Sequence, residues 1–348
     1  MSVPRFYFQL FLIGGLCLLQ GGCATIPLNP HTAAPYPRPE VHQEIYSATR
    51  EWTAAAGPWE SDHRRVTLTP AESPVPGNPP GGEAPILMDY FPCPDNERHP
   101  GLLISPILGG RNRVADHFAR YFARHGYHCA VVHRPKDLTR DIQSPGQLDE
   151  RLRMAVIRDR AALDWLGRQP EVDPKALGSF GISYGGIKNT VLAGVDNRLK
   201  ANVIALAGGD LPSIISHSNL PNLRNLFHRY AESNHLPPRE AEEKLRASLQ
   251  TEPLRFTPYI DPRTTLLILA RMDHTVPRRN GELLREALGY PRTIYLPAGH
   301  YSAVLFTGLA GYPYIESKVL EFFDGLLKGN GLLNCRERMN SALSGLPS

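Results

Sequence analysis

The residue best placed to do chemistry is a serine flanked by glycines, in Gly181-Ile182-Ser183-Tyr184-Gly185. An apolar run at 176–180 precedes it and helical spacing follows at 187–193, so the serine lies where a strand turns into a helix. Glycines permit a turn too tight for side chains, which exposes the hydroxyl. Ser183 is therefore the predicted nucleophile for attack on a carbonyl carbon.

A serine hydroxyl is a weak nucleophile unless a base removes its proton, and His300 is the predicted base. It follows a short predicted strand at 293–296, late in the chain. When the nucleophile lies on a strand-turn-helix of this kind, the histidine base comes after the acid in the sequence. Other histidines are weaker candidates: His217, His228 and His235 fall in a polar segment, and His274 adjoins the candidate acid.

The third catalytic residue should carry a carboxylate and should follow a strand that lies between the serine and the histidine in the sequence. Asp273 follows the apolar run at 264–270, and Val276-Pro277 then turns the chain toward another helix. An ionised aspartate can hold the imidazole in the required tautomer and stabilise the imidazolium. Asp210, after the strand predicted at 201–207, stays open as an alternative.

The negative charge that develops on the substrate needs two N–H donors. We expect one from the backbone of Tyr184, at the start of a helix. The second should come from the loop 106–110, where Leu108 is favoured and Ile107 is the alternative. This chemistry requires no cofactor, and no Cys or His spacing is typical of zinc, so neither a cofactor nor a metal is expected.

The elements that must position these residues alternate along the chain. Short apolar strands alternate with amphipathic helices, which predicts an α/β fold with a mostly parallel sheet covered on both faces. The segment 211–260 breaks the alternation and is predicted to be a small helical cap, with a plain connection as the alternative. The predicted strands are 64–69, 85–91, 101–105, 128–133, 176–180, 201–207, 264–270 and 293–296, and the predicted helices are 41–56, 113–125, 149–168, 187–193 and 315–327.

The order Ser183, Asp273, His300 resembles that of the α/β-hydrolases. Three segments look like the dienelactone hydrolase and prolyl-oligopeptidase-like branch of that superfamily. They are the segment 158–166, the serine turn at 181–185 with the additional Gly186 after it, and the loop 273–277. The resemblance spans about 64–328 and implies the α/β-hydrolase fold. Dienelactone hydrolases proper use cysteine where this chain has serine, so the resemblance implies ordinary serine ester chemistry.

Hydrolysis of a carboxylic ester, with a small-molecule ester as substrate, is the favoured function. A peptidase or amidase of the prolyl-oligopeptidase type is the alternative, although the stretch before residue 101 is too short for the β-propeller that such enzymes usually carry. A non-catalytic binding protein on the same fold is a third possibility. The complete set of Ser183, Asp273 and His300 argues against it.

The N-terminus resembles a bacterial lipoprotein signal. Arg5 precedes the apolar stretch 6–19, and two glycines precede Cys23. The usual leucine three residues before the cysteine is replaced by Gln20. We expect Cys23 to be lipidated and the exported protein to be anchored to a membrane. An ordinary secretory signal and an uncleaved anchor are the alternatives.

These patterns predict a signal peptide at 1–22, a flexible tether at 23–40, a hydrolase domain at 41–330 and a C-terminal tail at 331–348. The 348-residue chain has a formal net charge of +4, and its 38 Lys and Arg are interspersed with 34 Asp and Glu, so no nucleic-acid partner is expected. Cys129 is expected to be buried, pairing of Cys93 with Cys335 stays open, and so does the oligomeric state.

Overall fold

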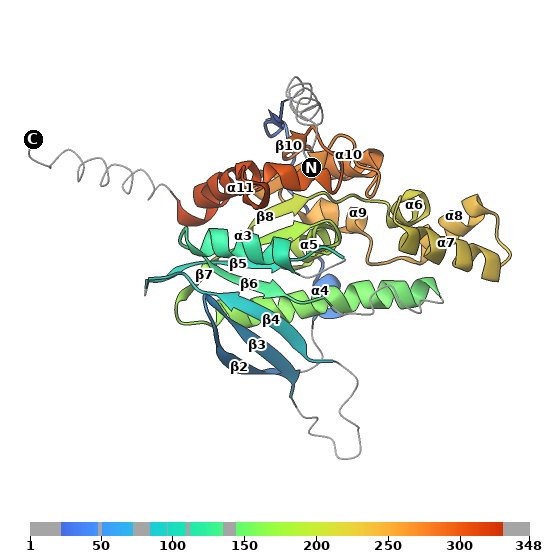
Figure 1. Ribbon diagram of the computed structural model, residues 1–348. Helices are drawn as coiled ribbons and strands as arrows, with labels where there is room; N and C mark the ends of the chain where they lie inside the picture. The colour runs from blue at the N-terminus through green and yellow to red at the C-terminus, as the bar shows by residue number, and fades with distance from the viewer. Residues whose placement is uncertain are drawn as a thin grey trace, which may run out of the picture.

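A ten-stranded sheet forms the centre of the computed structural model, which describes residues 22–47, 51–71, 84–95, 97–108, 112–134 and 144–329 (Figure 1). The strand order is β1-β10-β9-β8-β7-β5-β6-β4-β3-β2, and the six strands from β10 to β6 run parallel. The strands are β1 (Ala24–Ile26), β2 (Trp52–Glu60), β3 (His63–Pro70), β4 (Ile86–Phe91), β5 (His99–Ser105), β6 (His128–Val132), β7 (Val172–Ile182), β8 (Leu199–Ala205), β9 (Thr265–Ala270) and β10 (Arg292–Leu296). The predicted fold class is confirmed.

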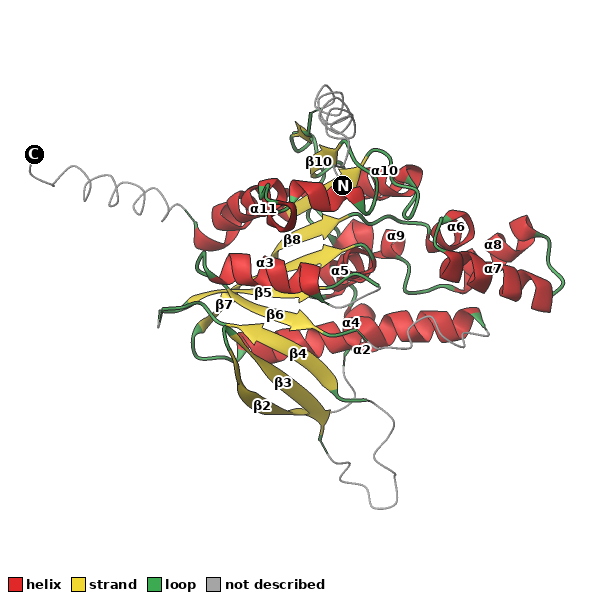
Figure 2. Ribbon diagram, viewed as in Figure 1, coloured by secondary structure: helices red, strands yellow, loops and turns green. Residues whose placement is uncertain are grey.

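Helices cover both faces of the sheet, as parallel strands require (Figure 2). On one face, Phe118 and Phe122 of α3 and Val319 of α11 pack in one buried cluster with sheet residues. On the other face, α4 and α5 supply Val156 and Val191 to a second cluster. The helices are α2 (Glu40–Ile45), α3 (Arg113–Ala123), α4 (Pro145–Gly167), α5 (Tyr184–Val195), α6 (Leu211–His217), α7 (Pro221–Ser233), α8 (Pro238–Ser248), α9 (Pro253–Phe256), α10 (Arg278–Ala287) and α11 (Tyr314–Phe323).

Several predicted helix boundaries differ from the structure, and the contacts explain two of the differences. Helix α4 begins at Pro145 rather than at 149, because the Ser144 hydroxyl caps it by accepting a hydrogen bond from the Gln147 N–H. The helix predicted at 41–56 is wrong over 52–56. These residues form the start of β2, which pairs with β3, so strand pairing overrides the helix propensity of the alanines.

Residues 24–38 lie against the domain. Strand β1 pairs antiparallel with β10, the Thr32 hydroxyl donates to the Gly289 carbonyl at 2.8 Å, and Arg38 Nη2 donates to the Ala193 carbonyl at 3.0 Å. This stretch therefore differs from the free tether that its composition predicts, because its donors find partners on the domain. The segment 1–21, most of the predicted signal peptide, lies outside the described residues, as do the tail from residue 330 and Cys335.

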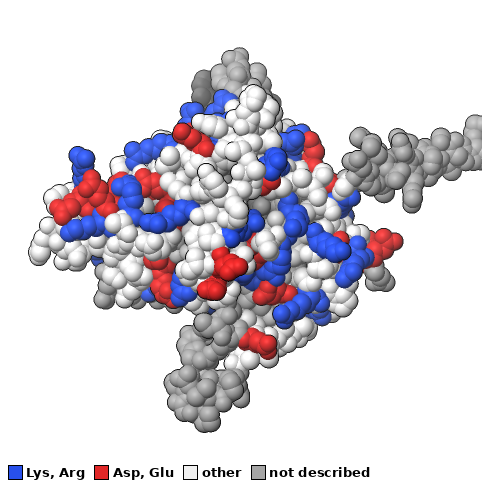
Figure 3. Space-filling view, turned by 180° about the vertical axis from the view of Figure 1, so that it is seen from behind, with Lys and Arg blue, Asp and Glu red and all other residues white. Residues whose placement is uncertain are grey.

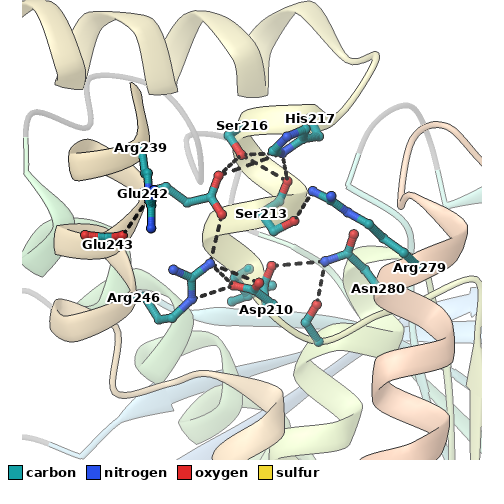
Figure 4. A network of polar contacts seen from close by, with 12 residues as sticks. Asp210, Ser213, Ser216, His217, Arg239, Glu242, Glu243, Arg246, Arg279 and Asn280 are labelled. Atoms are coloured by element: carbon teal, nitrogen blue, oxygen red, sulfur yellow. Dashed lines mark hydrogen bonds and ion pairs between the residues drawn. The ribbon is translucent and has the colours of Figure 1, made fainter. Parts of the chain in front are cut away.

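The helices α6 to α9 stand between β8 and β9 and confirm the predicted helical cap. In Figure 1, α6, α7 and α8 extend beyond the carboxyl ends of the parallel strands. A polar network fastens this cap to the domain (Figure 4). Arg246 of α8 pairs with Asp210 at 3.0 Å and with Glu242 at 2.8 Å, and Asn280 of α10 donates to the Gly209 carbonyl.

Charges of both signs are interspersed over the face of the molecule in Figure 3. Within the part of the chain that the structure describes, no helix combines the length and apolar character needed to cross a bilayer.

Candidate active site

Ser183 occupies a strained turn between β7 and α5. Its φ of 57° and ψ of −118° lie in a region that side chains rarely adopt. A Cβ atom on Gly181 would lie 2.3 Å from the Gly185 carbonyl oxygen, and one on Gly185 would lie 2.0 Å from the Ser105 carbonyl oxygen. Only glycine fits at either position, so the glycines of the motif serve to present the serine hydroxyl at the edge of the sheet.

The structure brings Ser183, Asp273 and His300 together in one hydrogen-bonded chain. His300 Nε2 lies 2.9 Å from Ser183 Oγ, and His300 Nδ1 lies 2.7 Å from Asp273 Oδ2. The three residues follow β7, β9 and β10, whose carboxyl ends share one edge of the sheet because the strands are parallel. The Asp273 and His300 side chains are only 4% and 8% exposed, so water screens their interaction weakly.

Backbone amides orient the Asp273 carboxylate. Oδ1 accepts hydrogen bonds from the N–H groups of Thr275 and Val276, each at 2.9 Å, which leaves Oδ2 for the imidazole. The carboxylate accepts a hydrogen bond from His300 Nδ1, so that nitrogen carries the proton. Nε2 is then the nitrogen that can accept the Ser183 proton.

The alternative acid, Asp210, has a different set of partners. Its carboxylate accepts from Arg246 Nε and Nη2 in the network that links α6 to α8 (Figure 4). His217, one of the competing histidines, lies in the same network, where Nδ1 is 2.7 Å from Ser216 Oγ. The geometry thus selects Asp273 over Asp210 as the partner of His300.

Two backbone segments meet where an oxyanion would form. Tyr184 is the first residue of α5, and N–H groups in the first turn of a helix lack intrahelical acceptors. The Gly185 contacts with Ser105 and Pro106 show that the loop after β5 crosses directly over this turn. Leu108 and Ile107 both line the cavity beside Ser183, so both stay candidates for the second donor.

The ring of Tyr184 packs in a buried cluster shared by α4, α5 and the cap. Its hydroxyl is buried without a hydrogen-bond partner among the described residues, and burial raises the phenol pKa far above its ordinary value. The ring therefore packs in the core and is not among the described residues that line the cavity beside Ser183.

A buried ion pair lies behind the nucleophile turn. Lys188 Nζ of α5 is 2.7 Å from Asp159 Oδ1 of α4, and the Ser105 hydroxyl donates to Asp159 Oδ2 at 2.9 Å. Both charged side chains are almost completely buried. This network joins α4, α5 and the end of β5, so it supports the turn and the oxyanion loop together. Asp159 and Lys188 are not among the residues that the sequence predicts for the site, because no spacing along the chain indicates that two helices bring them together.

A cavity of about 940 Å³ opens at Ser183 and His300. Its walls are mostly apolar and come from the sheet edge, from α3, from the start of α7 in the cap and from the segment after His300. Arg134 is the sole Lys, Arg, Asp or Glu among its described lining residues, and its Nη1 donates to Asn112 Oδ1 at 3.2 Å. The remaining described lining includes Val114, Phe118, Phe180, Leu206, Leu220, Leu223, Ile268, Thr275, Tyr301, Val304, Thr307 and Ile315.

One group among the described residues could hold a metal ion, and it lies far from the serine. Donor atoms of Cys93, Asp95 and His99 fall within 4.8 Å of one another at the amino end of β5, opposite the sheet edge that carries Ser183. His99 Nε2 and Asp95 Oδ1 already bond each other at 2.5 Å. The Cys93 thiol is buried and donates to Asp95, while Cys129 is buried as expected.

Comparison with known proteins assigns the chain to a family. The sequence profile of the X-Pro dipeptidyl-peptidase family (S15 family) matches residues 32–274, well over half of the chain. The chain belongs to this family. Among curated proteins, none matches the chain in sequence. The family match extends from the docked N-terminal segment to Asp273, and thus contains the nucleophile turn and the cap.

Solved structures share the fold. The acetyl xylan esterase from Paenibacillus sp. R4 superposes with a TM-score of 0.61 at 17% identity, over 83% of this chain and 93% of the esterase. Acetyl xylan esterase 1 from Thermoanaerobacterium sp. JW/SL YS485 gives 0.58 at 16% identity, over 85% and 99%. Pyrococcus horikoshii acylaminoacyl peptidase gives 0.53 at 15% identity, over 80% of this chain and 43% of the peptidase. The protein is a hydrolase with the α/β-hydrolase fold.

Proposed function

We propose that this protein hydrolyses a carboxylic ester through an acyl-enzyme on Ser183. The observation that carries the proposal is the continuous chain from Ser183 Oγ through the His300 imidazole to Asp273, at 2.9 and 2.7 Å. His300 removes the hydroxyl proton as Oγ attacks the ester carbonyl, and Asp273 stabilises the imidazolium that forms.

The tetrahedral intermediate places its negative oxygen between the two backbone segments described above. The N–H of Tyr184 and that of Leu108 or Ile107 donate to it. His300 then gives its proton to the leaving alcohol, and the acyl group stays on Ser183. Water that His300 deprotonates attacks the acyl-enzyme and releases the acid.

The cavity favours esters over dipeptidyl substrates. A peptidase that removes dipeptides must bind a free α-ammonium group, which requires a carboxylate or several carbonyl acceptors nearby. The described lining of the cavity contains no Asp or Glu. An apolar acyl group matches these walls better than an ammonium does. The family match keeps cleavage after an X-Pro dipeptide as the second candidate.

The test compares p-nitrophenyl esters of increasing acyl length with an X-Pro p-nitroanilide, on the wild-type protein and on Ser183→Ala. We expect ester turnover that Ser183→Ala abolishes and that Ser248→Ala, an exposed serine of α8, leaves unchanged. A fluorophosphonate probe should label the wild type and the control alone. Turnover of the anilide in preference to every ester would overturn the ester proposal in favour of the peptidase.

A further inference from the structure

An exposed apolar surface borders the active site. It consists of Tyr301, Val304, Leu305, Leu309 and Tyr312, which we call the mouth patch, and their exposed fractions range from 39% to 63%. The sequence from 301 to 314 contains no Asp, Glu, Lys, Arg or His. Folded proteins rarely expose contiguous apolar surface of this kind unless it binds a partner or a membrane.

The mouth patch is continuous with the catalytic cavity. Tyr301 and Val304 belong both to the patch and to the cavity lining, and the Tyr301 ring lies 5.4 Å from the His300 ring. Met272, 48% exposed, lies beside this segment, since its carbonyl oxygen approaches Gly299. A molecule bound on the patch would therefore reach the cavity without crossing polar surface.

The register of the sheet places Cys23 at the same edge. Ala24 of β1 pairs with Tyr295 of the antiparallel β10, so Cys23 lies level with Leu296, at the carboxyl end of the strand that leads to His300. Cys23 and Tyr314 are both partly buried and pack against the same hydrophobic cluster.

The Tyr314 ring stacks on the ring of Tyr312, a residue of the mouth patch, with centroids 5.9 Å apart. The apolar segment 6–19 ends immediately before this point. Because 24–38 are docked on the domain, no free linker separates Cys23 from the mouth patch.

We propose that the mouth patch lies against a lipid bilayer and that the active site opens toward it. Apolar contact beside a lipid-modified Cys23 would supply a second attachment of the protein to the membrane. Tyrosines at 301 and 312 suit the interface, where an aromatic ring meets lipid and its hydroxyl meets water. Exposed Arg271, whose backbone N–H donates to the carbonyl of Leu296 level with Cys23, suits anionic headgroups.

In this orientation the expected substrate is an amphiphilic ester whose acyl chain partitions into the bilayer. The substrate class rests on the proposed ester hydrolysis, whereas the docking does not. Such an ester could pass along Tyr301 and Val304 into the apolar cavity with its carbonyl at Ser183.

Photo-crosslinking in the exporting bacterium tests the docking on the full chain. The variant Leu309→p-benzoylphenylalanine places the probe on the mouth patch, and Leu326→p-benzoylphenylalanine places it on an exposed leucine after α11. We expect lipid adducts from position 309 and not from 326. Adducts from 309 with a second copy or with another protein, or no lipid adduct from 309, would overturn the proposal.

Hydrolysis tests the substrate class. In purified Leu305→Ser/Leu309→Ser protein, hydrolysis of a long-chain p-nitrophenyl ester embedded in phosphatidylethanolamine and phosphatidylglycerol vesicles should fall by about tenfold, while that of soluble p-nitrophenyl acetate stays within about twofold. Leu326→Ser should match the wild type on both. Equal rates on vesicles for all three proteins would overturn the substrate class. A wild type that cleaves no ester in either form would instead overturn the proposed function, and the lipid adducts would still decide the docking.

Discussion

At the scale of single residues, the two oxygens of the Asp273 carboxylate have different hydrogen-bond partners. The amides of Thr275 and Val276 occupy Oδ1, and the His300 imidazole occupies Oδ2. An asparagine in this place keeps the size but puts an NH₂ group against either the amides or the Nδ1–H. The imidazole is then driven toward the tautomer that cannot accept the Ser183 proton.

Asp273→Asn should therefore lower kcat for p-nitrophenyl ester hydrolysis by about 10⁴-fold with little change in KM. Asp210→Asn is the matched control, since Asp210 pairs with Arg246 in the cap and should leave kcat within about threefold. Steady-state kinetics on both variants measures the difference. A larger loss for Asp210→Asn would contradict the assignment of Asp273.

At the scale of elements, Glu252 joins the cap to the end of β8. Its carboxylate caps α9, and it accepts hydrogen bonds from the N–H groups of Asp210 and Leu211, both at 2.8 Å. Burial raises the pKa of Glu252 to about 7, and the backbone donors oppose that rise only in part. The carboxyl group thus binds a proton more readily in the folded protein than in the unfolded chain.

The sign of the pH effect follows from this raised pKa. Between pH 4.5, the ordinary value, and about 7, the folded protein holds more protons, so the unfolding free energy should fall as pH rises through this window. The fall should be on the order of 2–3 kcal/mol. Urea unfolding at pH 5, 6, 7 and 8 measures it. Glu252→Gln should remove this part of the slope and Glu243→Gln, on the surface of α8, should keep it; equal slopes would contradict the prediction.

At the scale of the whole molecule, the catalytic cavity exists because the cap lies over the sheet edge. Leu220, just before α7, and Leu223 of α7 line it together with Ile268 of β9 and Leu206 after β8. A volume of about 940 Å³ accommodates an acyl group much larger than acetyl. Acyl-chain preference should therefore depend on the contact between two parts of the chain that are far apart in sequence.

Leu223→Trp should fill part of this space and lower kcat/KM for p-nitrophenyl octanoate by about tenfold relative to the acetate. Arg224→Trp adds the same indole at the adjacent exposed position and should leave the ratio near that of the wild type. Measurement of both esters on both variants checks the prediction. An unchanged ratio in Leu223→Trp would mean that the acyl group binds elsewhere in the cavity.

The amino-acid sequence by itself determined what depends on local spacing. The glycines around Ser183 predict a tight turn, and the apolar periods predict the parallel sheet and the helical cap. The order of Ser183, Asp273 and His300 predicts which residues meet, since loops after parallel strands share one edge of the sheet. These inferences succeed because each depends on neighbours within a few residues or on chain order.

Tertiary structure decided what depends on distant partners. Asp273 and Asp210 both follow a strand, and only the positions of His300 and Arg246 separate their roles. The pairing of β1 with β10 docks a segment whose composition predicts a free tether. The ion pair of Asp159 with Lys188 needs two helices to meet in the core. In each case the deciding energy comes from a contact between segments far apart in the chain, which spacing along the sequence does not encode.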